Sequence, residues 1–317
     1  MATVLLTGAT GFVGGALARR LSVYGQYSLV LACRRQVMAP PRWIKSMVVG
    51  DIGQETDWSA ALSRVDVVVH LAARAHVFKD LASNPLAEFR KINTEGTLAL
   101  ARQAAEVGVR RFVFISSIGV NGNQSTQPFN EHDPPRPVEP YAISKYEAEQ
   151  GLSKIAEETA MEIVIIRPPL VYGPNAPGNF GRLLRWVDHG IPLPLGAIHN
   201  KRSLVALDNL VDLIITCLDH LAAANQTFLV SDGEDLSTTE LLRRMGLALG
   251  CPARLIPMPA SLLEAGAAFL GRREMAQRLC GSLQVDISKT RTLLGWNPPI
   301  SVDEGLRRTA RKFFDGL

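Results

Sequence analysis

Cysteine is scarce in this chain of 317 residues, and its four copies lie far apart. Cys33, Cys217, Cys251 and Cys280 form neither a Cys-x-x-Cys pair nor a cluster spaced for metal binding. A chain of this length also buries enough apolar surface to fold without disulfides. We therefore expect reduced core thiols and no metal site.

The sequence also lacks a long apolar run and a block of like charges. Its start, MATVLLTGAT, has neither the basic flank nor the cleavage site of a signal peptide, and no later stretch could span a bilayer. The net charge is only +4, with basic and acidic residues interspersed. These absences argue against secretion, membrane insertion and nucleic-acid binding. We expect a cytoplasmic protein with a mild preference for anionic ligands.

Short β-branched runs alternate with helical patterns along the first half of the chain. The runs occupy residues 3–6, 28–32, 47–49, 66–71, 112–115 and 163–166. This repetition predicts an α/β fold, a Rossmann-type doubly wound parallel sheet with helices on both faces. After Tyr172 the pattern weakens. Residues 1–172 are therefore expected to form the dinucleotide-binding domain and residues 173–317 mainly a smaller C-terminal substrate-binding lobe, with some segments returning to the first domain.

The stretch ThrGlyAlaThrGlyPheValGly directly follows the first run and opens a helix that is expected to end near Tyr24. Gly8 permits a tight turn, Gly11 lets the backbone approach a pyrophosphate at the helix N-terminus, and Gly14 lets the helix pack closely. This strand-turn-helix setting predicts a dinucleotide site. The other residues of the turn expected to contact the cofactor are Thr10, Phe12 and Val13.

The end of the second run should select the cofactor. It reads AlaCysArgArg and offers no acidic residue to accept the ribose hydroxyls of NAD. Arg34, supported by Arg35, can instead pair with the 2′-phosphate of NADP, so we favour NADP over NAD. Asp51 is placed to accept from the adenine amino group and Ile52 to pack on the ring, although a simple turn explains Asp51 as well.

TyrAlaIleSerLys places Tyr141 and Lys145 on one face of a helix. An ordinary tyrosine pKa of about 10 is too high for base catalysis at neutral pH, and the ammonium of Lys145 is expected to lower it. Ser116 and Ser117 end the fifth run at the sheet edge where ligands bind. Because a strand alternates its faces, only one of these serines should hold a carbonyl oxygen beside Tyr141.

In this order, the glycine turn, the serine pair and Tyr-x-x-x-Lys resemble the extended short-chain dehydrogenase/reductases, and within them the UDP-glucose 4-epimerase-like enzymes. Further matching stretches are HisLeuAlaAla at 70–73, IleAsnThrGluGlyThr at 92–97, ArgProProLeuValTyrGlyPro at 167–174 and ArgSerLeuValAlaLeuAspAsn at 202–209. The resemblance covers essentially the whole chain. It implies that Ser117 is the catalytic hydroxyl, Tyr141 the acid/base and Lys145 its charge partner, which also binds the cofactor.

The resemblance implies further contacts and a homodimer. The residues that would line or support the cofactor are Leu71, Ala72, Ala73, Asn93, Ser116, Pro168 and Val171. Those that would hold the substrate, a UDP-sugar, are Ser117, Tyr141, Asn179, Arg202 and Arg278.

Departures from the family pattern narrow the expected reaction. The family's 4,6-dehydratases carry an adjacent Asp-Glu pair after the fifth strand, whereas Ser117 and Ile118 stand here, which argues against dehydration. Cys33 and Arg34 replace an acidic residue of the 4-epimerases, and Leu170 replaces an Asn. The stretches SerSerIleGlyValAsnGly, GlyAsnPheGlyArgLeuLeuArgTrpVal and SerLeuGlnValAspIleSerLys are most similar to bacterial UDP-N-acetylquinovosamine dehydrogenases or 4-ketoreductases of surface-polysaccharide (O-antigen) assembly.

We therefore expect NAD(P)H-dependent reduction of the C4 keto group of a UDP-4-keto-6-deoxy-N-acetylhexosamine, with Tyr141 donating a proton to the oxygen that Ser117 holds. The alternative is 4-epimerisation of a UDP-hexose or UDP-N-acetylhexosamine by the same residues with a retained cofactor. A non-catalytic dinucleotide-binding sensor would not require an intact Ser117, Tyr141 and Lys145. A steroid or flavonoid ketone would not require Asn179 and Arg202.

Overall fold

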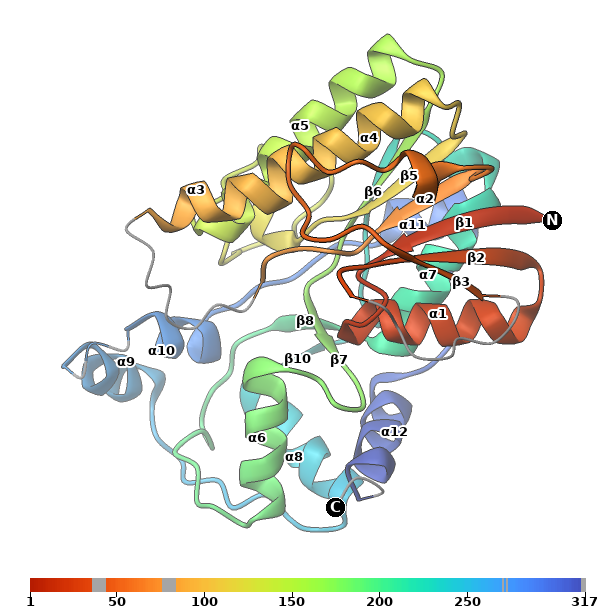
Figure 1. Cartoon of the computed structure of the whole chain (residues 1–317). Helices are drawn as coiled ribbons and strands as arrows, with labels where there is room; N and C mark the ends of the chain where they lie inside the picture. Colours follow the sequence, from red (N-terminus) through yellow and green to blue (C-terminus); the bar gives the residue numbers. More distant parts are fainter. Residues whose placement is uncertain (36–43, 76–83, 270, 272, 315–317) are drawn as a thin grey trace.

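A computed structural model (Figure 1) describes residues 1–35, 44–75, 84–269, 271 and 273–314. Its main sheet has seven strands in the order β3-β2-β1-β4-β5-β6-β9, with every neighbouring pair parallel. The strands are β1 (Ala2–Thr7), β2 (Tyr27–Cys33), β3 (Ile44–Val48), β4 (Val67–His70), β5 (Arg111–Ile115), β6 (Glu162–Arg167) and β9 (Gln226–Leu229). The predicted Rossmann sheet is confirmed, and each of the six expected runs overlaps one of the first six strands.

Helices cover both faces of this sheet (Figure 1). On one face lie α1 (Phe12–Tyr24), α7 (Leu207–Asp219) and α11 (Ser288–Leu294), and on the other α2 (Ser59–Leu62), α3 (Pro85–Arg90), α4 (Thr97–Glu106) and α5 (Pro140–Glu158). Each face has its own apolar core, with Leu17 and Leu210 in the first and Leu100 and Leu152 in the second. The strands are apolar because both of their faces are covered.

The smaller lobe surrounds a three-stranded sheet in the order β10-β8-β7. Its elements are β7 (Leu170–Tyr172), α6 (Gly178–Asp188), β8 (Arg202–Ala206), β10 (Asp235–Leu236), α8 (Thr238–Leu249), α9 (Ala260–Phe269), α10 (Arg273–Cys280) and α12 (Val302–Phe314). Three short turns are also helical: η1 (Lys91–Gly96, a π-helix), η2 (Ile118–Val120) and η3 (Leu221–Ala223). Beyond residue 173 the chain returns to the large sheet through α7, β9 and α11. No described helix combines the length and apolar composition needed to cross a membrane.

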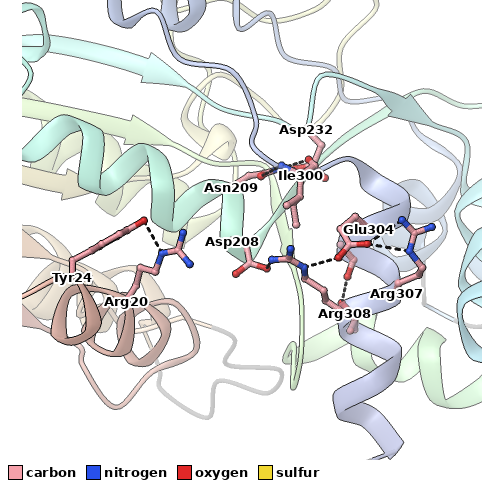
Figure 2. Close-up of polar contacts among 11 residues, drawn as sticks. Arg20, Tyr24, Asp208, Asn209, Asp232, Ile300, Glu304, Arg307 and Arg308 are labelled. Atoms are coloured by element: carbon pink, nitrogen blue, oxygen red, sulfur yellow. Dashed lines mark hydrogen bonds and ion pairs between the residues drawn. The ribbon is translucent and has the colours of Figure 1, made fainter.

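The buried carboxylate of Asp232, which follows β9, connects elements of both lobes. It accepts hydrogen bonds from Ala206 N at 2.8 Å, Asn209 Nδ2 at 2.7 Å and the hydroxyl of Tyr172 at 2.7 Å. The side chain of Asn209 also bonds the backbone of Ile300, just before α12 (Figure 2): Nδ2 donates to the carbonyl at 2.9 Å, and Oδ1 accepts from the amide at 3.0 Å. Burial raises the pKa of Asp232, and its three donors oppose that rise. The carboxylate thereby ties β7, α7 and the approach to α12 together.

Tyr172→Phe should reveal how much the fold depends on this joint. It removes one of three donors from a buried carboxylate, so the free energy of unfolding in urea should fall by about 1–3 kcal/mol. Tyr24→Phe is the matched control. Tyr24 is exposed, and its hydroxyl accepts a hydrogen bond from the surface side chain of Arg20 (Figure 2). We expect the control to change stability by less than about 0.5 kcal/mol. Equal losses in both variants would contradict the importance given to Asp232.

Candidate active site

The glycine turn lies at the carboxyl edge of the large sheet, where β1 ends. Gly8 has φ +70°, and a Cβ there would lie 2.8 Å from the amide nitrogen of Ala72. A Cβ on Gly14 would lie 2.1 Å from the carbonyl oxygen of Gly8. Both positions therefore require glycine. Gly11, the N-cap of α1, has no side chain to cap the amides of the first helical turn, so they can receive an anion.

The remaining turn residues, Thr10, Phe12 and Val13, occupy the loop and first turn of α1. Across from them, the segment after β4 approaches the turn closely. Thr7 Oγ1 accepts hydrogen bonds from the amides of Leu71 at 3.2 Å and Ala72 at 3.1 Å. The structure thus brings Leu71, Ala72 and the adjoining Ala73 beside the glycine turn, as a cofactor-lining segment requires.

The predicted adenosine contacts lie at the ends of β2 and β3, which are neighbours in the sheet. Arg34 and Arg35 are exposed, and the guanidinium of Arg34 lies 3.8 Å from the carboxylate of Asp51. Ile52 packs against η1, since a Cβ on Gly96 would meet its Cγ2 at 2.6 Å. The arginine that we expected to meet a phosphate is therefore already beside a carboxylate.

A buried polar chain beneath the turn was missed in the sequence. Thr7 accepts two amide bonds, so its single proton goes to His70 Nδ1 at 2.8 Å. His70 Nε2 then donates to Thr97 Oγ1 at 3.0 Å, which donates to the carbonyl of Asn93 at 2.7 Å. This order assigns the neutral Nε2–H tautomer to His70. Burial first, and the charge of Lys145 second, lower the pKa of His70 to about 3.

Asn93 extends this chain to the helix that carries Tyr141. Its Oδ1 accepts from Arg74 N at 2.8 Å, and its Nδ2 donates to Arg74 O at 3.1 Å and to Ser144 Oγ at 3.0 Å. Ser144 Oγ donates to the carbonyl of Tyr141 at 2.8 Å. Asn93 lies in the π-helical turn η1, a conformation that is common at functional sites. Asn93 is thus bonded through Ser144 to the start of α5, and its supporting role stays a prediction.

Tyr141 and Lys145 both lie on α5, but their environment differs from the expected one. Lys145 is 1% exposed, and its Nζ donates to the carbonyl of Ile115 at 2.9 Å. Tyr141 is half-buried, with its ring edge-on to that of Phe89 at 6.2 Å between centroids. Burial raises the pKa of Tyr141 to about 12 and lowers that of Lys145 to about 7. Desolvation dominates both groups in this structure and opposes the lowering of the Tyr141 pKa that we expect from Lys145.

The serine pair follows β5, and its two hydroxyls have different surroundings. Ser116 is 3% exposed, and its Oγ has no hydrogen-bond partner within the described part of the chain. Ser117 Oγ accepts from Gly119 N at 3.1 Å. A Cβ on Gly119 would lie 3.2 Å from the Cβ of Ala142, so the turn carrying Ser117 packs against α5 beside Tyr141. The turn after β5 carries Ser117, and the start of α5, which packs against this turn, carries Tyr141 and Lys145.

The contacts predicted beyond β6 are distributed over both lobes. Pro168 is buried, and its carbonyl accepts from Ile118 N at 3.0 Å, while Val171 lies in β7. Asn179 occupies the first turn of α6.

The two arginines predicted to hold the diphosphate are close together. Arg202 Nη1 donates to the carbonyls of Arg278 at 2.9 Å and Gly281 at 3.0 Å. Arg278 Nη2 pairs with Glu139 Oε1 at 2.6 Å, two residues before Tyr141. Burial and the neighbouring Arg278 lower the pKa of Arg202. The structure therefore links the predicted diphosphate contacts to the start of α5.

Comparison with known proteins is consistent with this geometry. A family model described as "NAD dependent epimerase/dehydratase family" matches residues 4–231. A UDP-glucose 4-epimerase of Vibrio cholerae is 47% identical over 98% of this chain and 95% of its own length. The N-acetyl-alpha-D-glucosaminyl-diphospho-ditrans,octacis-undecaprenol 4-epimerase of Escherichia coli O157:H7 is 27% identical over 98% of this chain and 95% of its own length.

Solved structures of low sequence identity share the fold. A Thermotoga maritima UDP-glucose 4-epimerase with UDP-glucose has a TM-score of 0.79 at 22% identity, covering 99% of each chain. A Bacillus cereus UDP-glucuronic acid 4-epimerase with UDP-glucuronic acid and NAD has a TM-score of 0.81 at 22% identity, covering 99% of this chain and 100% of its own.

Acid should destabilise the chain through His70. Its pKa is about 3 in the fold against about 6.5 when unfolded. The unfolded chain therefore binds more protons between these values, and stability is lost as the pH falls from about 6.5 toward 3. Between about pH 7 and pH 5, the free energy of unfolding should fall by about 2 kcal/mol more in the wild type than in His70→Gln.

Urea unfolding at the two pH values measures this difference. His132→Gln is the control, because the side chain of His132 is 83% exposed. The control should keep the pH dependence of the wild type. If the free energy of unfolding of His70→Gln falls with pH as much as that of the wild type, His70 is not the group that causes the loss of stability in acid.

Proposed function

Because this chain belongs to the NAD dependent epimerase/dehydratase family, we propose that it is a 4-epimerase of a UDP-hexose or a UDP-N-acetylhexosamine. The observation that supports this most is the 47% identity, over 98% of the chain, to the UDP-glucose 4-epimerase of Vibrio cholerae. It favours epimerisation over the C4 ketoreduction that the sequence patterns led us to expect first. The ketoreductase stays a prediction.

The described residues fit a bound dinucleotide. Gly8 and Gly14 leave no room for a Cβ, the N-cap of α1 offers no side chain to its first amides, and the buried hydroxyl of Ser116 lacks a partner among the residues that the structure describes. The glycine turn would hold the pyrophosphate, and Ser116 and Lys145 would hold the nicotinamide half. When bound, oxidised NAD would supply a hydride acceptor and a positive charge, and reduced NAD would return the hydride.

The chain's own residues would hold and move one proton. The Gly119 amide occupies one acceptor position of Ser117, which leaves the serine proton for a sugar oxygen. With a pKa of about 12, Tyr141 keeps its proton at neutral pH and is suited to donate it to O4. Taking that proton back requires a lower pKa, and a protonated Lys145 on the same helix face would favour the phenolate. Dehydration is not proposed, because residues 116–122 hold no carboxylate.

The substrate diphosphate is proposed to lie near Arg202 and Arg278, whose guanidinium groups suit phosphate oxygens. Arg278 Nη2 lies 2.6 Å from Glu139 Oε1 in this structure. To bind the diphosphate, Arg278 would have to leave Glu139 or contact the carboxylate and the diphosphate together. The Escherichia coli relative, whose sugar is likewise carried on a diphosphate, is consistent with such a contact.

Epimerisation is tested by incubating the purified protein with UDP-glucose, UDP-galactose and their N-acetylamino counterparts in the presence of NAD. We expect interconversion of one pair of C4 epimers, measured by chromatography, without net formation of NADH, measured by absorbance. Stoichiometric consumption of NAD(P)H with a 4-keto UDP-sugar, and no epimer, would instead support the ketoreductase.

The same assay tests Tyr141. Tyr141→Phe should slow turnover by about 10²–10⁴-fold while leaving the Kd for NAD unchanged. Tyr146→Phe removes the same atom from the same helix, where the hydroxyl contacts only Gln150 among its bonds in the described chain. This control should retain wild-type turnover. Full activity in Tyr141→Phe would remove its proposed role.

The cofactor preference is a separate question. Arg34 and Arg35 support the predicted NADP, but a carboxylate 3.8 Å from Arg34 opposes a 2′-phosphate, and the Bacillus cereus neighbour contains NAD. We therefore propose NAD. Asp51→Asn should strengthen NADP binding several-fold and change NAD binding little, as calorimetry of both cofactors can measure. Tighter binding of NADP than NAD by the wild type would restore the first expectation.

A further inference from the structure

A buried ion pair between α5 and the end of β6 has no role in the proton transfer described above. Arg167 Nε and Nη2 donate to the two carboxylate oxygens of Glu149 at 3.0 and 2.5 Å. The two residues are 5% and 3% exposed. Two parallel bonds of this kind fix the orientation of both side chains as well as their distance.

The arginine also holds the turn that carries Ser117. Arg167 Nη1 donates to Asn121 Oδ1 at 2.9 Å, and Asn121 ends η2, which begins directly after Ser117. The carbonyl of Pro168, the residue after Arg167, accepts from Ile118 N at 3.0 Å. The end of β6 is therefore bonded to both ends of η2. A shift of Arg167 would move the serine hydroxyl.

The carboxylate is placed to act on Lys145. Glu149 lies four residues after Lys145 on α5, so the two side chains share a helix face, and both are buried. His70 on β4 feels the charge of Lys145, Tyr141 stands four residues before Lys145 on α5, and the guanidinium of Arg167 is bonded to the Glu149 carboxylate. Burial lowers the pKa of Lys145 to about 7, and Glu149 is the charge that opposes this shift.

We propose that Glu149 and Arg167 are positioning residues for the reaction: through Asn121 the pair fixes the turn of Ser117, and through α5 it keeps a negative charge behind Lys145. A purely structural ion pair would stabilise the fold without changing the protonation of Lys145. The inference rests on the proposed function only for its kinetic readout, because the protonation of Lys145 can be followed without any substrate.

Glu149→Gln should lower the pKa of Lys145 by about one pH unit or more. The measurement is an NMR titration of the full chain labelled at lysine Cε, with the signal of Lys145 assigned by its loss in Lys145→Met. Glu147→Gln is the matched control. It removes the same charge from the same helix, where the carboxylate is partly exposed and pairs with Arg90. The control should leave the titration of Lys145 at its wild-type position.

Glu149→Gln leaves Arg167 without its carboxylate and could prevent folding. The double variant Glu149→Gln/Arg167→Gln leaves neither charge of the pair, and it should lower the pKa of Lys145 by a smaller amount, because the opposing positive charge of Arg167 is removed with the carboxylate. An unchanged titration of Lys145 in whichever of these variants folds would overturn the electrostatic part of the proposal. The predicted shift in a chain that epimerises no UDP-sugar would support the inference while contradicting the proposed function.

Asn121→Ala tests the other part of the proposal. It separates Arg167 from η2 without changing any charge, so the titration of Lys145 should stay at the wild-type position while kcat falls about tenfold and KM changes little. In Glu149→Gln, the alkaline limb of the pH profile of kcat should move to lower pH. Glu149→Asp keeps a carboxylate and should show a smaller shift. An unchanged kcat in Asn121→Ala would show that the pair does not position Ser117.

Discussion

Buried side chains joined by hydrogen bonds hold the carboxyl edge of the large sheet in one arrangement. They run from Thr7 through His70 and Thr97 to Asn93, and through Ser144 to the helix of Tyr141. Each donor in this series of hydrogen bonds meets an acceptor only if His70 is neutral and protonated at Nε2. These hydrogen bonds therefore fix the positions of the glycine turn, the cofactor-lining segment and α5 relative to one another. The free-energy cost of burying the polar groups is offset because each of them is hydrogen-bonded.

Burial also determines the charges of the proposed catalytic residues. The pKa of Tyr141 is raised to about 12 and that of Lys145 lowered to about 7, so desolvation favours the neutral form of each. Glu149 is the countercharge to Lys145, and its own cost of burial is offset by the two bonds from Arg167. The proposed catalytic residues therefore lie between uncharged, hydrogen-bonded side chains around His70 and the ion pair of Glu149 on α5 with Arg167 on β6.

The sequence predicts the elements of this site better than their partners. The strand pattern locates the sheet, and the spacing of Gly8, Gly11 and Gly14 locates the turn, because both follow from local periodicity. Contacts between distant residues leave no such local pattern: Thr7 and His70 are 63 residues apart, and Glu149 and Arg167 are 18 apart. The carboxylate beside Arg34 and the desolvation of Tyr141 likewise require the fold. The homodimer, the cytoplasmic location and the roles of Asn179 and Arg202 stay predictions.

A 4-epimerase that retains its cofactor returns the hydride removed from C4 of the sugar to the same carbon. The direct measurement uses UDP-galactose carrying deuterium at C4, incubated with the protein and NAD, with NMR analysis of the product. We predict UDP-glucose, or its N-acetylamino counterpart from the matching substrate, with deuterium retained at C4. Loss of the deuterium to NADH in solution, with accumulation of a 4-keto sugar and no epimer, would contradict the proposed epimerase.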